Sequence, residues 1–234
     1  MGLRHVFLDF GNTLVCERPS RFEIYAQAAR AEGVEIGEAE MRGLMVRAHL
    51  ELPEEIDGGW RYTDPWFRRY IVRIFGEELG IEPGSWDEFH AGLFGRFSDP
   101  ETFELFAGAG ELFAGLRDAG LGIGVISNWS PRLPGLIESL GLTEIFDPVV
   151  CSAIERLEKP SPEIFELALE RAGVSANESL HAGDHPDKDC RAATSLGFQT
   201  VLVDHAGEHL GRDLPYARAT SLGELKDHIL AQPR

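Results

Sequence analysis

The sequence predicts an α/β fold, in which a parallel sheet is covered by helices on both faces and a helical insertion follows the first strand. Three observations predict it. Short apolar runs recur along the chain, and each ends at a turn or polar residue, as buried strands do. Amphipathic stretches of helical length separate the later runs, and this alternation is typical of a parallel sheet. Residues 16 to about 100 contain only helical patterns.

Apolar runs and helical patterns give the order of the expected elements along the chain. The expected strands cover residues 5–9, 123–126, 148–151, 180–182 and 199–203. Helices are expected over 111–119, from Ser161-Pro162-Glu163 to Gly173, and over 189–196, because capping residues, a first-turn proline and terminal glycines mark their ends. In the insertion, helices are expected over 21–31, 38–50, 65–79 and 85–97. The predicted domains are therefore a core of residues 1–15 and 101–234 and an inserted domain of residues 16–100.

Composition and charge exclude several classes of function. The net charge of −17 argues against a nucleic-acid or anionic-membrane surface, which would need clustered Lys and Arg. An anionic substrate would need a bound divalent cation to reverse that charge locally. The three cysteines, Cys16, Cys151 and Cys190, are too sparse for a disulfide framework and favour a reducing compartment. No apolar run approaches the ~18 residues that span a bilayer, so a cytoplasmic protein is expected.

Reactive side chains stand where three of the expected strands end. Asp9, Ser127 and Asp184 each follow or close an apolar run, and Lys159 comes one loop after another. Each alone has an ordinary explanation as a turn, cap or surface residue. Ligands of open parallel sheets bind at the carboxyl ends of the strands. The four residues together therefore predict an active site at that edge.

Four segments resemble the four sequence motifs of the haloacid dehalogenase superfamily. They are Val6-Phe7-Leu8-Asp9-Phe10-Gly11-Asn12-Thr13-Leu14, Val125-Ile126-Ser127-Asn128, Lys159-Pro160-Ser161-Pro162-Glu163-Ile164-Phe165 and Gly183-Asp184-His185-Pro186-Asp187-Lys188-Asp189. The resemblance implies a Rossmann-like core with an inserted helical cap of the C1 type. The stretch from Ile126 to Leu142 is similar to the subgroup named haloacid dehalogenase-like hydrolase domain-containing protein 3.

The resemblance also implies a Mg²⁺-dependent phosphatase that acts on a small phosphorylated metabolite. Asp9 would attack phosphorus and form an aspartyl-phosphate, assisted by Ser127 and Lys159 as the other catalytic residues. The implied metal site comprises Asp9, the backbone carbonyl of Gly11, Asp184 and Asp189, with Asp189 acting through a bound water. The implied substrate-binding residues are Gly11, Asn12, Ser127, Asn128 and Lys159.

One position departs from the family pattern. Most phosphatases of the superfamily carry a second Asp two residues after the nucleophile, where it protonates the leaving group and later activates water. This chain has Gly11 there, which has no side chain for either task. General acid–base help is typically worth about 10²- to 10⁴-fold in rate. Ordinary phosphatase activity is therefore the part of the expectation that this glycine puts in question.

Three alternatives remain beside the phosphatase. A 2-haloacid dehalogenase also uses an aspartate nucleophile and needs no metal, but its pattern has an aromatic at the position of Gly11 and lacks the acidic pair Asp184 and Asp189. A phosphonate hydrolase tolerates a small residue at position 11 but needs a cap lysine, and residues 16–100 contain none. A catalytically weak binding or regulatory protein is the third alternative. The sequence leaves the substrate and the oligomeric state open.

Overall fold

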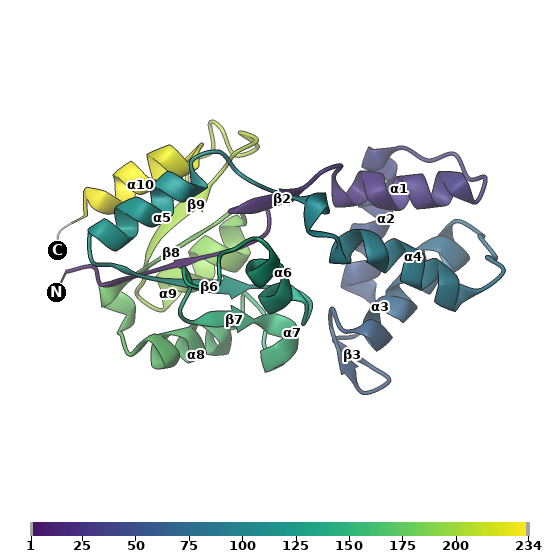
Figure 1. Ribbon diagram of the computed structural model, residues 1–234, viewed down its shortest axis with the longest axis horizontal. Helices are drawn as coiled ribbons and strands as arrows, with labels where there is room; N and C mark the ends of the chain where they lie inside the picture. Colours follow the sequence, from purple (N-terminus) through teal and green to yellow (C-terminus); the bar gives the residue numbers. More distant parts are fainter. Residues whose placement is uncertain (1, 233–234) are drawn as a thin grey trace. The chain divides into compact units, whose positions relative to one another are not determined.

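The chain folds into two compact units in the computed structural model, which describes residues 2–232. One unit is formed by the chain up to Cys16 together with the chain from Leu105 onward, and the other is Glu17–Glu104 (Figure 1). No helix among the described residues is both long enough and apolar enough to cross a membrane.

The first unit is built on one six-stranded sheet, which confirms the predicted α/β fold. Its strand order is β10-β9-β8-β1-β6-β7, and every pair in it is parallel. The strands are β1 (His5–Leu8), β6 (Gly122–Ser127), β7 (Val149–Cys151), β8 (Ser179–Gly183), β9 (Gln199–Val203) and β10 (Ala217–Ala219). The first five match the expected apolar runs. β10 was not expected, because three residues at a sheet edge leave almost no periodic signal.

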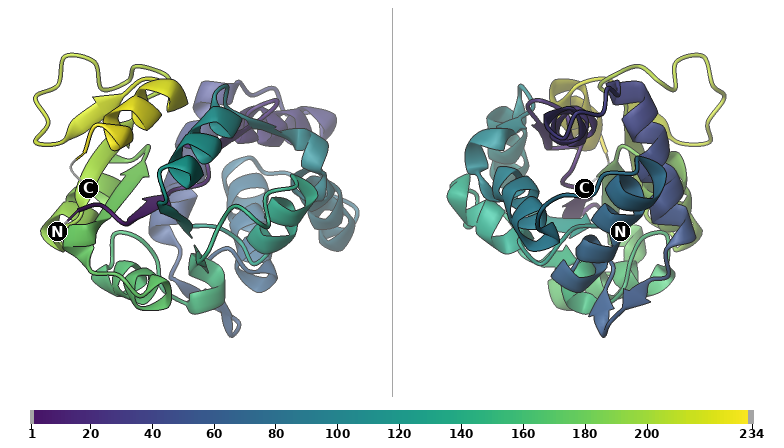
Figure 2. Two further views of the ribbon diagram at one scale, coloured as in Figure 1. Left: turned by 60° about the vertical axis from the view of Figure 1, so that its left-hand side comes forward. Right: turned by 90° about the vertical axis from the view of Figure 1, so that its right-hand side faces the viewer.

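Helices cover both faces of this sheet. On one face α5 (Ala109–Asp118) packs against α10 (Leu222–Leu230), and on the other α8 (Pro162–Ala172) lies beside α9 (Ala192–Ser195) (Figure 1). Figure 2 shows β10 and α10, both in yellow, side by side at the edge of the sheet. Shorter helical segments complete the unit: α6 (Leu133–Ser139), α7 (Ser152–Glu155), the 3₁₀ turn η3 (Ala176–Glu178) and the π-helical turn η4 (Pro186–Arg191).

The signals that predicted α8 act largely as expected. Pro162 occupies the first turn, where its missing N–H costs nothing, and Gly173 ends the helix with a left-handed φ of 63°. Ser161 precedes the helix but does not cap it, because its hydroxyl donates to Glu163 instead. The inner face of α8 buries Ile164, Phe165 and Ala168 against the sheet.

The sheet register brings the predicted site residues to one edge. Leu8, at the end of β1, pairs with Val125 of β6 on one side and with Ala182 of β8 on the other. The chain segments that follow these three positions therefore leave the sheet together. They carry Asp9, Ser127 and Asp184.

The second unit is mainly helical and has its own core. Its helices are α1 (Arg21–Ala31), α2 (Glu38–Glu51), α3 (Asp64–Ile71), the π-helical η1 (Val72–Glu78) and α4 (Trp86–Ser98), followed by a 3₁₀ turn, η2 (Pro100–Thr102). Trp66 is fully buried in that core, and its indole N–H donates to the carbonyl of Pro53 at 2.8 Å. A partner of this kind is what a buried tryptophan requires.

The expectation that this region holds no strand was wrong. β3 (Glu55–Ile56) and β4 (Gly59–Trp60) form a two-stranded hairpin. Asp57 and Gly58 connect them with φ angles of 50° and 76°. Two positive φ angles at an Asp-Gly pair are the signature of a tight hairpin turn. The signal was missed because the strands are only two residues long.

Two further strands carry the chain into and out of the second unit. β2 (Val15–Glu17) pairs with β5 (Phe103–Leu105). The backbone N–H of Phe106 donates to the carbonyl of Leu14, and that of Arg18 to the carbonyl of Thr102. The two crossing points of the chain therefore lie next to each other.

Candidate active site

Asp9 follows β1 directly and is almost fully buried. Its backbone N–H donates to the carbonyl of Ala182, which continues the β1–β8 ladder by one residue. Its Oδ1 accepts hydrogen bonds from Ser127 Oγ at 3.0 Å and from Lys159 Nζ at 2.7 Å. Its Oδ2 accepts a longer bond from Thr13 Oγ1 at 3.3 Å. Three donors from three different segments therefore fix the orientation of this carboxylate.

Ser127 is the last residue of β6, and its neighbour Asn128 holds Lys159. The side-chain oxygen of Asn128 accepts from the backbone N–H of Lys159, and its side-chain nitrogen donates to the backbone carbonyl of Lys159, each at 2.8 Å. The loop after β7 is thereby tied to the end of β6. This bridge brings Lys159 to Asp9, 150 residues away in sequence.

Lys159 is one of the most deeply buried charged side chains of the molecule, with 2% exposure. Its ammonium group lies between two carboxylates, 2.7 Å from Asp9 Oδ1 and 2.5 Å from Asp189 Oδ1. Burial alone would lower the pKa of Lys159, but Asp189 and Asp9 outweigh it and raise the pKa above the usual lysine value. The ammonium group is therefore charged and fixed at neutral pH.

Asp189 lies in η4 and is buried among donors. Its Oδ1 contacts Lys159 and also His181 Nε2 at 3.0 Å, and its Oδ2 accepts the backbone N–H of His185 at 3.0 Å. Burial would raise the pKa of Asp189, but Lys159 and His181 reverse this and hold it well below the usual carboxyl value. Asp189 is therefore an anion held in one orientation.

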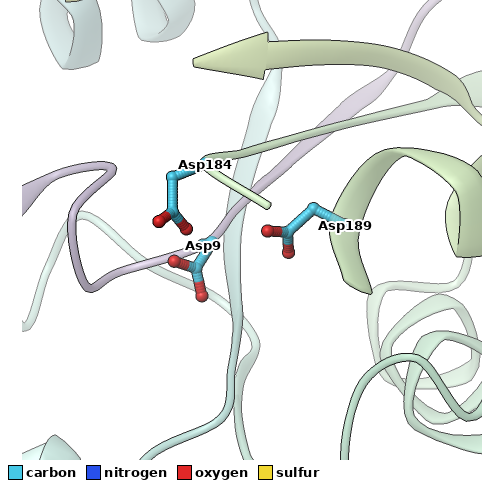
Figure 3. A group of neighbouring side chains, drawn as sticks. All are labelled: Asp9, Asp184 and Asp189. Carbon is cyan, nitrogen blue, oxygen red and sulfur yellow. The ribbon is translucent and has the colours of Figure 1, made fainter. Parts of the chain in front are cut away.

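Three carboxylates converge at this edge of the sheet. Asp9, Asp184 and Asp189 each offer one oxygen, and these oxygens lie within 4.8 Å of one another. Figure 3 shows the side chains of Asp184 and Asp189 directed toward Asp9. Hard carboxylate oxygens are the donors that Mg²⁺ prefers. Together with Lys159 the cluster carries three formal negative charges and one positive, a net −2, so its donors and its charge both fit a divalent cation.

Comparison with known proteins agrees with this geometry. A sequence model of the haloacid dehalogenase-like hydrolases matches residues 3–197. The chain is 30% identical over 218 residues to haloacid dehalogenase-like hydrolase domain-containing protein 3 of Danio rerio, covering 91% of this chain and 90% of that protein. The chain belongs to the haloacid dehalogenase-like hydrolase family. The resemblance seen in the sequence, including the subgroup, is confirmed.

Two further comparisons of this haloacid dehalogenase-like hydrolase are informative, one by sequence and one by fold. It is 26% identical to the phosphoserine phosphatase of Thermus thermophilus over 250 residues, with 98% of this chain and 99% of that protein covered. Its fold matches the putative hydrolase YfnB of Bacillus subtilis, a structure bound to magnesium, with a TM-score of 0.77 at 16% identity, covering 98% of this chain and all of that one. The second comparison supports the fold alone.

The backbone of the turn after Asp9 shows whether position 11 requires a glycine. The positive φ angle of the turn falls on Asn12, at 57°, and not on Gly11. The backbone N–H of Asn12 donates to the carbonyl of Val15, and the Thr13 carbonyl bonds His205 Nε2 at 3.0 Å. Asn12 is itself exposed. The turn is therefore held by its backbone, and the glycine at position 11 is not demanded by a left-handed conformation.

The structure gives three residues near the site a contact that the sequence did not predict. Thr13 donates to Asp9, and His181 contacts Asp189 from the middle of an apolar strand. His185 directly follows Asp184, and its Nδ1 accepts the backbone N–H groups of Asp187 and Lys188, so its ring caps η4. The one available signal was a histidine inside the strand Leu180-His181-Ala182, where a polar residue needs a partner.

Proposed function

We propose that this hydrolase is a Mg²⁺-dependent phosphatase that acts on a small phosphorylated metabolite through an aspartyl-phosphate at Asp9. The supporting observation is the cluster of Asp9, Asp184 and Asp189, whose oxygens lie within 4.8 Å of one another, with the Lys159 ammonium group between Asp9 and Asp189. The three carboxylates repel one another unless a cation is bound between them. A metal-independent dehalogenase would bind no such cation. The phosphatase activity of the Thermus thermophilus relative agrees with this assignment.

The covalent step requires an oriented nucleophile. A carboxylate oxygen of Asp9 forms a bond to phosphorus while the bond from phosphorus to the leaving oxygen breaks, and the leaving group departs with the electron pair. Water then attacks phosphorus, inorganic phosphate leaves, and the Asp9 carboxylate is restored. Ser127 and Lys159, which hold Asp9 in the structure, are placed to donate to phosphoryl oxygens in both steps.

The metal site would be formed by Asp9, the backbone carbonyl of Gly11 and Asp184, with Asp189 acting through a bound water. The indirect role of Asp189 is the one that the family resemblance implies, and its Oδ1 is already shared by Lys159 and His181. The bound ion would supply positive charge that offsets the charge developing on the phosphoryl group. Within the proposed substrate-binding set of Gly11, Asn12, Ser127, Asn128 and Lys159, Asn128 contributes by holding Lys159, since its amide is already engaged.

The test is a phosphate-release screen over phosphorylated metabolites, run with Mg²⁺ and with chelator. Wild type should release phosphate only with Mg²⁺, and Asp9→Asn and Asp184→Asn should abolish the release. Asp187→Asn is the matched control, because Asp187 lies three residues after Asp184, in η4, but is exposed and pairs with Arg191. Turnover undiminished in chelator would refute the metal role. Halide release from a 2-haloacid in chelator would establish the dehalogenase instead.

A further inference from the structure

A buried histidine stands behind the candidate active site. His181 is the middle residue of β8, paired with Phe7 of β1 on one side and with Thr200 of β9 on the other. Its side chain is fully buried. The chemistry proposed above gives it no part, and a fully buried polar side chain in a central strand calls for an explanation.

The imidazole of His181 has one polar contact and one apolar wall. Its Nε2 lies 3.0 Å from Asp189 Oδ1, and the ring of Phe165 meets it edge to face at 5.2 Å and 90°. Its Nδ1 is buried and finds no hydrogen-bond partner among residues 2–232. The ring is therefore anchored at one nitrogen only.

This environment selects one form of the ring. Asp189 is an anion and only accepts hydrogen bonds, so the nitrogen facing it must carry a proton. A proton on Nδ1 as well would leave a buried donor without a hydrogen-bond partner in a charged ring. His181 is thus a neutral Nε2–H donor.

We propose that His181 is a positioning residue, whose Nε2–H fixes Asp189 Oδ1 so that Lys159 stays bridged between Asp189 and Asp9. The same Oδ1 atom accepts from Lys159 Nζ at 2.5 Å, while Oδ2 is held by the backbone of His185. The four-carbon stem of a lysine is flexible, so the location of its ammonium group depends on the carboxylates that hold it. Without His181, nothing in the described part of the chain holds Oδ1 except the lysine itself.

A neutral donor suits this position better than a charged one. An arginine or lysine in place of His181 would compete with Lys159 for Asp189 and would reduce the net negative charge of the cluster. The imidazole orients Asp189 while leaving that charge unchanged. The kinetic part of this inference rests on the proposed phosphatase function, whereas the geometric part does not.

Two spectroscopic measurements test the geometry without any turnover. In ¹⁵N-histidine spectra at pH 7, the signals lost in His181→Gln should report a neutral ring protonated at Nε2. In ¹⁵N-lysine spectra the chain has only three lysines, Lys159, Lys188 and Lys226. A slowly exchanging ammonium signal should belong to Lys159, because this side chain is buried and doubly paired.

Two variants separate the hydrogen bond from simple packing. His181→Gln keeps an N–H donor near the Nε2 position, and His181→Leu keeps bulk without the donor. His181→Leu should broaden or lose the Lys159 signal and lower kcat for phosphate release at least about tenfold with little change in KM. His181→Gln should preserve the signal and recover most of the rate. His5→Leu, which removes a buried histidine at the amino end of β1, away from the site, should change neither.

Several outcomes would overturn the inference. One is a wild-type His181 that is protonated only at Nδ1 or is cationic at pH 7. Another is an unperturbed Lys159 signal in a folded His181→Leu protein. Equal losses in His181→Gln and His181→Leu would assign the residue to packing alone. If His181→Leu does not fold, His181→Met replaces it in the comparison. If wild type releases no phosphate from any substrate, the proposed function fails while the spectroscopic tests still decide the geometry.

Discussion

The side-chain amide of Asn128 bonds both the backbone N–H and the backbone carbonyl of Lys159, each at 2.8 Å. One amide thus satisfies a donor and an acceptor of a loop 31 residues later in the chain. The site lysine is held from two directions: by Asn128 at its backbone, and by Asp9 and Asp189 at its ammonium group.

The first prediction concerns this bridge. Asn128→Ala should destabilise the protein by about 1–3 kcal/mol, because it leaves a partly buried N–H and carbonyl without their partners. It should also lower kcat, since Lys159 loses its backbone anchor. Asn128→Asp keeps the acceptor for the Lys159 N–H but places a carboxylate oxygen against the carbonyl, so it should recover little. Urea denaturation and steady-state kinetics measure the two effects. A wild-type kcat in a folded Asn128→Ala protein would contradict the role.

The second prediction concerns metal binding in the absence of substrate. Mg²⁺ at about one hundred times its Kd should stabilise the folded protein by about 2.7 kcal/mol, because it binds only the folded state. The rise in Tm should vanish in Asp184→Asn and persist in Asp187→Asn. Differential scanning calorimetry at several Mg²⁺ concentrations measures it. Equal rises in wild type and Asp184→Asn would show that the ion binds elsewhere.

The third prediction uses pH and His5. This residue begins β1 and is buried, and burial lowers its pKa to about 4. The unfolded chain therefore binds a proton between about pH 6.5 and pH 4 that the folded protein does not, and folding stability must fall as the pH drops through this window. At about 1.4 kcal/mol per pKa unit, the full loss is roughly 3 kcal/mol.

The matched variant for this measurement is His5→Leu. Its free energy of unfolding should fall less between pH 7 and pH 4 than that of wild type, by an amount close to the contribution of His5. Denaturant titrations at fixed ionic strength measure both proteins. His181 and His185 remain in the two proteins and contribute equally. Parallel stability curves across this pH range would show that His5 titrates normally in the folded state.

The fourth prediction concerns Gly11. With no acid there, substrates with good leaving groups, such as aryl and acyl phosphates, should be hydrolysed much faster than alkyl phosphates. Gly11→Asp should raise the rate on alkyl phosphates most, by about tenfold or more, because general acid help is worth up to several orders of magnitude. The left-handed residue of the turn is Asn12, so the backbone at position 11 places no such demand on the substitution.

A leaving-group series on wild type and Gly11→Asp measures this effect, with thermal melts as the folding control. Wild-type rates that do not vary with leaving-group pKa would mean that another group already supplies the proton. Lower or equal rates on alkyl phosphates in a folded Gly11→Asp protein would reject the missing carboxylate as the limit.

An element of the fold could be predicted from the sequence when its pattern of apolar and capping residues was long enough. The buried strands of the core and the helices between them were found from runs of apolar residues and caps, since these patterns extend over many residues. β10 and the hairpin around Asp57 and Gly58 escaped because they occupy two or three residues each. The π-helical form of η4 also escaped, because its register is set by tertiary contacts around Asp189 and not by local propensity.

The candidate site also has a part that could be predicted from the sequence and a part that could not. Asp9, Ser127, Lys159 and Asp184 could be found because each stands at a strand end or in the following loop. The contacts of His181 and Asn128 could not, because each depends on which atom of one segment meets which atom of another. Sequence patterns specify which face of an element a side chain occupies, and the individual hydrogen bonds follow only when the segments are packed.

The pairing of β2 with β5 has an evolutionary consequence. The backbone N–H of Arg18 donates to the carbonyl of Thr102 at 2.7 Å, so the chain leaves and re-enters the core unit at almost the same place. An ancestral core would need only a tight hairpin turn there in order to close without the inserted residues. Inserted domains of different size and sequence can then replace one another between β2 and β5, while the register of the six-stranded sheet is preserved. Proteins that share such a core can in this way carry different inserted domains while the core itself stays the same.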